Sequence, residues 1–242
     1  MKRFYTDQII QNNKIQLNGK NYHYIKNVLR MNSGDKLILF NGTGYEYEGC
    51  ISLISNEHIE ITINNKFFNN NESKLELTLC LSILKDKKMD IIIRQSTELG
   101  VKNIIPFHSE RSVPKPSKNQ IQKKIERWKS ITIEAAKQCR RSIIPNIYDY
   151  LSFTDLVNLD KQFDLKIIFW ENAVESITKN NLKNIKNIIV FIGPEGGFSE
   201  KEINIAKKNN FFISKIGPRI LKSETAAISA CSLIQYIFGD MN

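Results

Sequence analysis

The sequence predicts two domains of different class, a small N-terminal β-barrel and a larger α/β domain with a largely parallel sheet. Short strand-like segments separated by turns fill the chain up to about residue 70, where a polar, turn-prone stretch follows. Beyond that stretch, apolar strand segments alternate with helical segments. A chain of 242 residues is long enough for such domains to bury a core.

The N-terminal barrel is predicted from three strand segments joined by short turns. The strands span residues 36–40, 46–53 and 58–63. The first two are joined by the turn Asn41-Gly42-Thr43-Gly44, and this spacing is typical of a small barrel. Residues 67–73, with the sequence Phe-Phe-Asn-Asn-Asn-Glu-Ser, are the predicted linker. We therefore expect domains of residues 1–72 and 73–242.

The second domain is predicted from five apolar segments with helical segments between them. The expected strands are residues 75–84, 103–107, 165–170, 187–192 and 212–216. Strands that alternate with helices indicate a parallel sheet, and such sheets bind ligands beyond the carboxyl ends of their strands. The loops that follow these strands are therefore the place to look for a site.

A long amphipathic helix is predicted between Ile121 and Arg141, and it carries much of the charge of the chain. Its apolar or small face consists of Ile121, Ile125, Trp128, Thr132, Ala135 and Cys139. The whole chain has a net charge of +10, and residues 111–145 hold 10 Lys and Arg against 2 Asp and Glu, whereas residues 1–72 hold 8 against 7. This concentration favours a phosphate-contacting surface over the alternative of a solvated helix face.

Several classes of protein are disfavoured by the composition. The four cysteines, Cys50, Cys80, Cys139 and Cys231, contain no C-x-x-C pair, and the three histidines lack partners at a metal-ligand spacing. No apolar segment follows the charged N-terminus, and no apolar run approaches the length of a membrane span. We therefore expect a cytoplasmic protein with no disulfide, no metal and no membrane association.

Two glycine-containing turns are the most specific local features. Residues 187–192 form an apolar strand that runs into Gly193-Pro194-Glu195-Gly196-Gly197-Phe198, after which Ser199 and Glu202 form a capping box that begins a helix. The turn fits neither a P-loop nor a dinucleotide motif, so phosphate is not the expected ligand. For this turn alone, a structural strand-to-helix connection is the alternative to a ligand site.

The second turn spans residues 216–226, with the sequence Ile-Gly-Pro-Arg-Ile-Leu-Lys-Ser-Glu-Thr-Ala, and leads into the last helix. Ser223 is a candidate cap of that helix, which is apolar on more than one face and ends at Gly239. A helix of this kind is expected to be buried in the core or at a subunit interface. Two strand-end turns in adjacent βα units are expected to line one crevice.

The paired turns resemble the signatures of RsmE-type enzymes, the 16S rRNA (uridine-N3) methyltransferases of the SPOUT superfamily. Further segments resemble the family in its order: residues 97–101, 109–113 and 134–138, Arg141 and Pro145, and, near the N-terminus, Arg3-Phe4, residues 28–30 and Gly34-Asp35. The resemblance covers nearly the whole chain. Gln95 and Lys222 depart from it, since the family usually has Lys and Arg at these places.

The resemblance implies a PUA-like N-terminal barrel that binds RNA and a SPOUT α/β domain with a deep trefoil knot. It also implies S-adenosylmethionine as cofactor, a homodimer, and methylation of uridine N3 in 16S rRNA, free or in the assembled 30S subunit, at the uridine numbered 1498 in the usual rRNA numbering. The implied cofactor-binding residues are Ile168, Trp170, Gly193, Glu195, Gly196, Gly197, Ile216, Gly217, Ile220, Leu221 and Thr225. Arg3, Arg30, Arg111, Lys123, Lys124, Arg127, Arg140 and Arg141 are the expected RNA contacts.

Methylation of uridine N3 requires that its imide proton leave before the nitrogen attacks. An arginine stabilises the resulting anion and a carboxylate accepts the proton, so Arg219 or Arg3 is the candidate cation and Glu195 or Glu224 the candidate base. The alternatives are structural, because Glu195 is able to fix its own loop and Glu224 to favour the helix dipole. A knotted methyltransferase acting on tRNA or a ribose 2'-hydroxyl, and a noncatalytic RNA-binding protein, are the rival functions.

Overall fold

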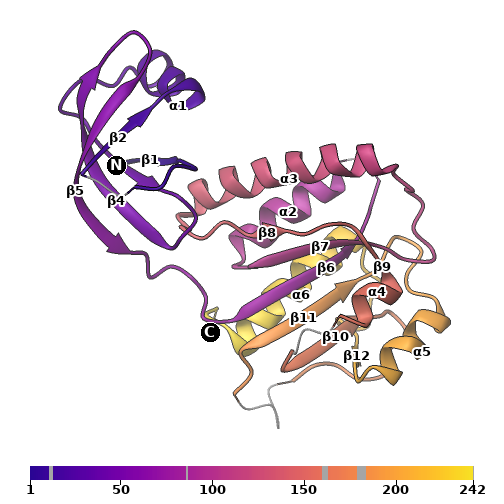
Figure 1. Ribbon diagram of the computed structural model, residues 1–242. Helices are drawn as coiled ribbons and strands as arrows, with labels where there is room; N and C mark the ends of the chain where they lie inside the picture. Colours follow the sequence, from indigo (N-terminus) through magenta and orange to yellow (C-terminus); the bar gives the residue numbers. More distant parts are fainter. Residues whose placement is uncertain (11–12, 86, 160–162, 179–183, 242) are drawn as a thin grey trace. The chain divides into compact units, whose positions relative to one another are not determined.

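The computed structural model describes residues 1–10, 13–85, 87–159, 163–178 and 184–241, and its chain forms two compact units. Unit 1 comprises residues 1–72 and 136–144, and unit 2 comprises residues 73–135 and 145–242 (Figure 1). Unit 1 therefore takes a second segment from the middle of the chain. Within the described ranges, every helix is too short or too polar to cross a lipid bilayer.

Unit 1 is built on a curled five-stranded sheet. Its elements are β1 (Lys2–Tyr5), β2 (Lys14–Leu17), α1 (Gly19–His23), the π-helix η1 (Tyr24–Val28), β3 (Lys36–Phe40), β4 (Tyr45–Ile54) and β5 (Ile59–Phe68). The strand order is β1-β3-β4-β5-β2, in which only the β1–β3 pair is parallel. The curled sheet confirms a PUA-like fold. It is a half-barrel, because β1 and β2 lie at its two edges and do not pair with each other within the described residues.

Alternation along the strands of unit 1 directs one face of the sheet to a core. In β3, Leu37 and Leu39 are fully buried, and they pack with Phe4, Ile25 and Ile61. The strand predicted at residues 36–40 is confirmed, and the strand predicted at 58–63 continues to Phe68. The predicted linker is therefore shorter than expected, since its two aromatic residues pair with β4.

Two buried arginine–carboxylate pairs fasten residues 136–144 to the rest of unit 1. Arg3 donates from Nη2 to Glu46 Oε1 at 2.5 Å and from Nη1 to the carbonyl of Lys137 at 3.0 Å. Arg141 donates from Nε to Glu72 Oε2 at 3.0 Å, and the other Glu72 oxygen accepts from the backbone of Ser142 at 3.0 Å. All four charged side chains are less than one-tenth exposed. Each charge thus depends on its partner, because an unpaired charge is costly to bury.

Unit 2 is an α/β domain with an all-parallel, seven-stranded sheet. Its strands are β6 (Glu76–Ser82), β7 (Asn103–His108), β8 (Asn146–Ile147), β9 (Leu151–Ser152), β10 (Leu165–Phe169), β11 (Asn187–Ile192) and β12 (Phe212–Ser214). The order is β12-β10-β11-β6-β7-β8, and β9 also pairs with β7. The strand predicted at residues 212–216 ends at Ser214 because Lys215 donates its backbone N–H to Glu175.

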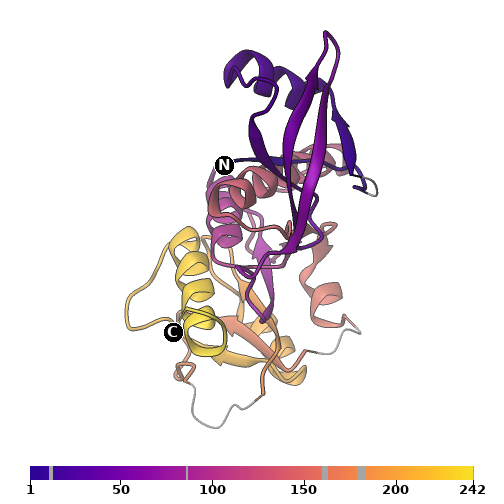
Figure 2. The ribbon, with the colours of Figure 1, turned by 90° about the vertical axis from the view of Figure 1, so that its left-hand side faces the viewer.

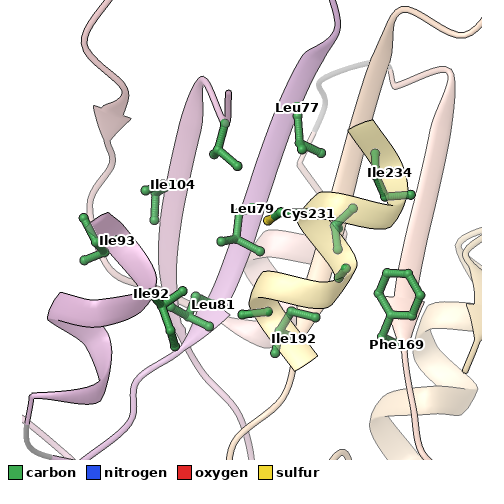
Figure 3. Close-up of a cluster of buried hydrophobic side chains, with 14 of the residues drawn as sticks. Leu77, Leu79, Leu81, Ile92, Ile93, Ile104, Phe169, Ile192, Cys231 and Ile234 are labelled. Atoms are coloured by element: carbon green, nitrogen blue, oxygen red, sulfur yellow. The ribbon is translucent and has the colours of Figure 1, made fainter. Parts of the chain in front are cut away.

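Helices cover both faces of the sheet of unit 2. They are α2 (Lys88–Glu98), α3 (Lys118–Cys139), α4 (Phe153–Val157), α5 (Glu200–Lys208) and α6 (Ser223–Phe238). Along β11, Ile188, Val190 and Ile192 pack with α2, α3 and α6, whereas Ile189 and Phe191 pack with α4 and α5. The side chains on the face covered by α2, α3 and α6 form the first core of unit 2, and those on the face covered by α4 and α5 form the second core. Figure 3 shows part of the first core, and Figure 2 shows α2 beside α6. A strand buried on both faces is continuously apolar, as the sequence of β11 is.

The long amphipathic helix is confirmed with bounds close to those expected. Ile121, Ile125 and Trp128 are buried in the first core of unit 2. The helix ends at Cys139 because Arg140 adopts a left-handed conformation with φ of 63°, and the Arg141 N–H closes the turn on the Ala136 carbonyl at 2.9 Å. The last turn of α3 therefore belongs to unit 1.

Candidate functional site

Three loops that follow neighbouring strands of unit 2 line a cavity that is open to solvent. They come from the carboxyl ends of β10, β11 and β12, and the first turn of α6 completes the wall. The lining residues are Phe169, Trp170, Glu171, Ile192, Gly193, Pro194, Gly197, Phe198, Lys215, Ile216, Gly217, Arg219, Leu221, Ser223 and Ala226. The cavity lies at the edge of the sheet where parallel sheets bind ligands.

The glycine turn after β11 is held in shape by its own backbone. Gly197 donates its N–H to the carbonyl of Pro194 at 3.0 Å and has a φ of +67°, which L-residues rarely adopt. A Cβ on Gly197 would lie 2.4 Å from Oε1 of Glu171, in the loop after β10. A Cβ on Gly193 would lie 3.1 Å from the buried ring of Phe198. Close packing of two strand-end loops therefore requires these glycines.

The predicted capping box is confirmed, and it also anchors a second loop. The Ser199 hydroxyl accepts from the Glu202 N–H at 3.2 Å, and Glu202 Oε2 accepts from the Ser199 N–H at 2.9 Å. The same carboxylate accepts from the Ser109 hydroxyl at 3.2 Å and the Glu110 N–H at 3.0 Å. Arg111, the next residue, donates to the carbonyl of Gly196 at 3.0 Å. The loop at residues 109–113 thus supports the glycine turn.

Replacing Glu202 by alanine is expected to lower the free energy of unfolding by about 1–3 kcal/mol. The change removes a cap and leaves the buried N–H of Ser199 and the partly buried N–H of Glu110 without their acceptor. Denaturant unfolding followed by tryptophan fluorescence measures this, since Trp128 and Trp170 both lie in unit 2. Glu200→Ala is the matched control because Glu200 is exposed in the same helical turn. Equal losses for the two variants would contradict the structural role of Glu202.

Lys88, at the start of α2, lies between two glutamates of the site. Its Nζ is 3.0 Å from Oε1 of Glu195 in the glycine turn and 3.7 Å from Oε2 of Glu224 in the first turn of α6. Partial burial raises the pKa of Glu195, but its own backbone N–H and the hydrogen bond and charge of Lys88 outweigh this and lower it. The hydrogen bond to Glu195 raises the pKa of Lys88. Both candidate bases are therefore neighbours of one cation.

Replacing Lys88 by methionine is expected to move the pKa of Glu195 up towards its ordinary value of 4.5. The lowered pKa of Glu195 contributes stability that is present above the ordinary value and is lost as the pH falls through the lowered pKa, so this acid-side loss of stability should be smaller in the variant. An NMR titration of the Glu195 carboxyl carbon measures the shift. The exposed neighbour provides the control variant, Lys87→Met. An unchanged titration curve would show that Lys88 does not govern this carboxyl.

Six of the eleven predicted cofactor-binding residues line the cavity: Trp170, Gly193, Gly197, Ile216, Gly217 and Leu221. The other five lie elsewhere. Ile168 is fully buried in the second core, Ile220 is 85% exposed, and Gly196 packs against Arg111. Glu195 points to Lys88, and Thr225 is exposed on α6. The sequence did not indicate Lys88 or Lys215, because a lysine at the start of a helix or after a strand has no distinctive spacing.

The predicted catalytic and RNA-contacting residues fall in different environments. Arg219 is exposed and lines the cavity, and none of the described residues forms an ion pair with its guanidinium. Arg3 and Arg141 are the buried arginines of unit 1, where their side chains bind protein groups and are not open to a ligand. The exposed members of the predicted RNA-contacting set are Arg30, Arg111, Lys123, Arg127 and Arg140, whereas Lys124 is half-buried. Arg127 pairs with Asp90.

Comparisons with known proteins cover both units. Residues 71–235 match the family described as "RNA methyltransferase domain", and residues 17–64 match the "RNA methyltransferase PUA domain". Over 242 residues, the chain is 38% identical to ribosomal RNA small subunit methyltransferase E of Buchnera aphidicola from Schizaphis graminum, covering 99% of this chain and 98% of that protein. It is 30% identical to the Bacillus subtilis protein of the same name, covering 98% and 96%.

Solved structures show the same similarity. Ribosomal RNA small subunit methyltransferase E from Neisseria gonorrhoeae, bound to S-adenosylmethionine, aligns over 100% of both chains with a TM-score of 0.90 and 28% identity. A Legionella pneumophila methyltransferase in complex with the same cofactor aligns over 98% of both chains with a TM-score of 0.90 and 32% identity. The chain belongs to the ribosomal RNA small subunit methyltransferase E family, with an RNA methyltransferase domain and a PUA domain.

Proposed function

We propose that this protein transfers a methyl group from S-adenosylmethionine to N3 of a uridine in 16S rRNA. The observation that carries the proposal is the cavity formed by the three strand-end loops, in a chain whose relatives are named as small-subunit rRNA methyltransferases. We propose that the target is the uridine numbered 1498 in the usual rRNA numbering, as the family resemblance implies. We further propose that the protein acts in the cytoplasm as a homodimer, and that the loops thread a trefoil knot.

The residues that line the cavity suit S-adenosylmethionine. Apolar side chains of Phe169, Ile216 and Leu221 would pack against its uncharged parts, and backbone groups of the glycine turn lie close to the cavity without a Cβ in the way. The indole Nε1 of Trp170 is buried and has no hydrogen-bond partner within the described residues, so it is able to donate to a ligand. When bound, the cofactor supplies an electrophilic methyl group.

Arg219 is the residue that we assign to the uridine. A uridine N3 becomes nucleophilic only after its proton leaves, and a cation at the cavity stabilises the resulting anion. Glu195 and Glu224 both lie beside Lys88, and the pKa of Glu195 is lowered. An ionised carboxylate is able to accept the imide proton, but the low pKa makes Glu195 a weak base. Stabilisation of the anion by Arg219 is therefore the larger contribution that we expect from side chains.

Replacing Arg219 by methionine is expected to lower kcat by about 10- to 100-fold, since one hydrogen bond to a charged group is lost. The deficit should shrink as the pH rises, because more uridine is then deprotonated without help. A pH–rate profile of wild type and variant measures both effects, and calorimetry with S-adenosylmethionine controls for cofactor binding. Lys222→Met serves as the control for loss of a nearby exposed charge. A constant deficit at all pH values would contradict a role in stabilising the anion.

The decisive experiment for the function is methylation of 30S subunits from a strain that lacks the modification, followed by mapping of the label. N3-methyluridine in 16S rRNA is the expected product. Label in tRNA or on a ribose 2'-hydroxyl would instead assign the protein to those methyltransferases. If the folded protein neither transfers methyl groups nor binds S-adenosylmethionine in calorimetry, it is a noncatalytic RNA-binding protein. Free 16S rRNA, assayed in parallel, distinguishes the two forms of the substrate.

A further inference from the structure

An exposed tyrosine of unit 1 is held in an unusual backbone segment. Tyr24 begins the π-helix η1, and such helices are rare and occur often at functional sites. Its side chain is 40% exposed, and Val28, at the other end of the same turn, is 58% exposed. The Tyr24 ring contacts the buried ring of Phe4 edge to face, with centroids 6.3 Å apart. One part of the Tyr24 ring is therefore held against the core, while another part is exposed to solvent.

A lysine from the second segment of unit 1 lies beside this ring. The Nζ of Lys137 is 5.0 Å from the centroid of Tyr24 and 5.8 Å from that of Phe4. The backbone carbonyl of Lys137 accepts from the buried Arg3, so the position of the lysine is set by the packing of unit 1. A cation next to an exposed aromatic ring is the combination that binds a base and its phosphate in single-stranded nucleic acid.

Two exposed arginines of unit 1 adopt a left-handed backbone conformation. Arg30 has φ of 51° and follows η1, whereas Arg140 has φ of 63° and follows α3. Glycine occupies such positions without strain, so a large side chain there is retained at a cost in stability. The Leu29 N–H bonds the Tyr24 carbonyl at 2.9 Å, which brings the chain at Arg30 back to the π-helical turn. Arg140 lies one helical turn beyond Lys137.

Tyr22 provides a contrast within the same segment. Its hydroxyl donates to the backbone carbonyl of Asn56 at 2.8 Å and accepts from Lys26 at 2.6 Å. Its ring is therefore tied to the protein. Tyr24 lies two residues after Tyr22. Within the described part of the chain, its hydroxyl forms no such hydrogen bond. The exposure of Tyr24 is thus not explained by a structural hydrogen bond.

We propose that Tyr24 is a stacking platform for an unpaired base of the RNA substrate, and that Lys137, Arg30 and Arg140 contact the neighbouring phosphates. This inference rests on the proposed function, since it takes RNA to be the substrate. It assigns to unit 1 a contact with single-stranded RNA in addition to a general attraction for phosphate. The positive charge of residues 111–145, to which Lys137 and Arg140 belong, complements that partner.

Fluorescence anisotropy with two probes separates stacking from charge. The probes are a labelled single-stranded oligouridylate and an abasic ribose-phosphate strand of the same length. Tyr24→Ala should weaken oligouridylate binding by about 5- to 100-fold and leave binding of the abasic strand unchanged. Tyr24→Phe should bind both as wild type does. Lys137→Met should weaken both probes alike and reduce the salt dependence by about one ion. Tyr22→Phe is the matched control and should change neither affinity.

Several outcomes would overturn the inference. Failure of the wild-type protein to bind oligouridylate at low salt would overturn it. An unchanged affinity of the Tyr24→Ala protein for oligouridylate, or an equal loss of affinity for both probes, would also overturn it. A change in oligomeric mass with no change in RNA affinity would assign the face to a protein contact instead. Unchanged hydrogen-exchange protection of β3 and β4, which lie in unit 1, shows that this unit is folded in the variants. Failure of this inference is distinguishable from failure of the proposed function, because in the second case the wild-type protein would not methylate 30S subunits at all.

Discussion

Replacing Gly197 by alanine is expected to lower methyl transfer on the order of 100-fold or more, with the protein still folded. The φ of +67° makes any L-residue strained at this position, at a cost of about 1–3 kcal/mol. The new Cβ would also lie 2.4 Å from Oε1 of Glu171, so the Glu171 carboxylate must move. Because Gly197 and Glu171 both line the cavity, the displacement changes the space for the cofactor.

Steady-state kinetics and calorimetry with S-adenosylmethionine measure this effect, and two further variants identify its cause. Gly34→Ala introduces comparable backbone strain at φ of +92° in unit 1, where a Cβ would meet nothing within 4 Å. That control is expected to be less stable but fully active. Adding Glu171→Ala to Gly197→Ala should recover part of the activity if the overlap matters. Full activity of the single variant would show that the turn tolerates a side chain.

Replacing Arg3 by methionine is expected to lower the free energy of unfolding of unit 1 by about 3–5 kcal/mol. The side chain of Glu46 is 7% exposed and would keep a buried charge without its cation. The carbonyls of Lys137 and Arg141, which accept from Arg3 at 3.0 Å, would lose a charged donor as well. The loss therefore acts on both segments of unit 1 at once.

Hydrogen exchange is the appropriate measurement for this prediction. Both tryptophans lie in unit 2, so their fluorescence does not report unit 1, and two units need not unfold as one. Amides of β3 and β4 should lose protection in Arg3→Met protein, whereas Lys2→Met, at an exposed neighbour, should resemble wild type. In Arg3→Met/Glu46→Gln protein, part of the stability should return because the unpaired charge is gone. Unchanged protection in Arg3→Met protein would contradict the assigned role.

The strands and turns were largely predictable because their signals are local. Residues 36–40 and 187–192 are strands with the expected bounds, and the capping box follows from the three-residue spacing of Ser199 and Glu202. The cavity was expected from the position of two turns after parallel strands. The cofactor was not predictable from these signals, because backbone groups bind many ligands and only the family resemblance named one.

The remaining features depend on contacts between residues far apart in the sequence. Nothing in the local pattern showed that residues 136–144 join unit 1, because a helix face does not reveal which core it packs against. Arg3 and Arg141 were therefore assigned to RNA, although the structure buries both. The sequence predicted a barrel where the structure has a half-barrel, because the spacing of strands along the chain does not determine whether the two edge strands pair.

The return of residues 136–144 has a consequence for the order of events during synthesis. Arg3 bonds the carbonyl of Ala136, 133 residues later, so the first unit cannot complete its core until the ribosome has released residue 144. By then residues 73–135 of the second unit have also emerged, whereas its strands β10 to β12 have not. Until then the N-terminal strands have unpaired edges, so nascent chains from which fewer than about 144 residues have emerged are the most exposed to misassembly.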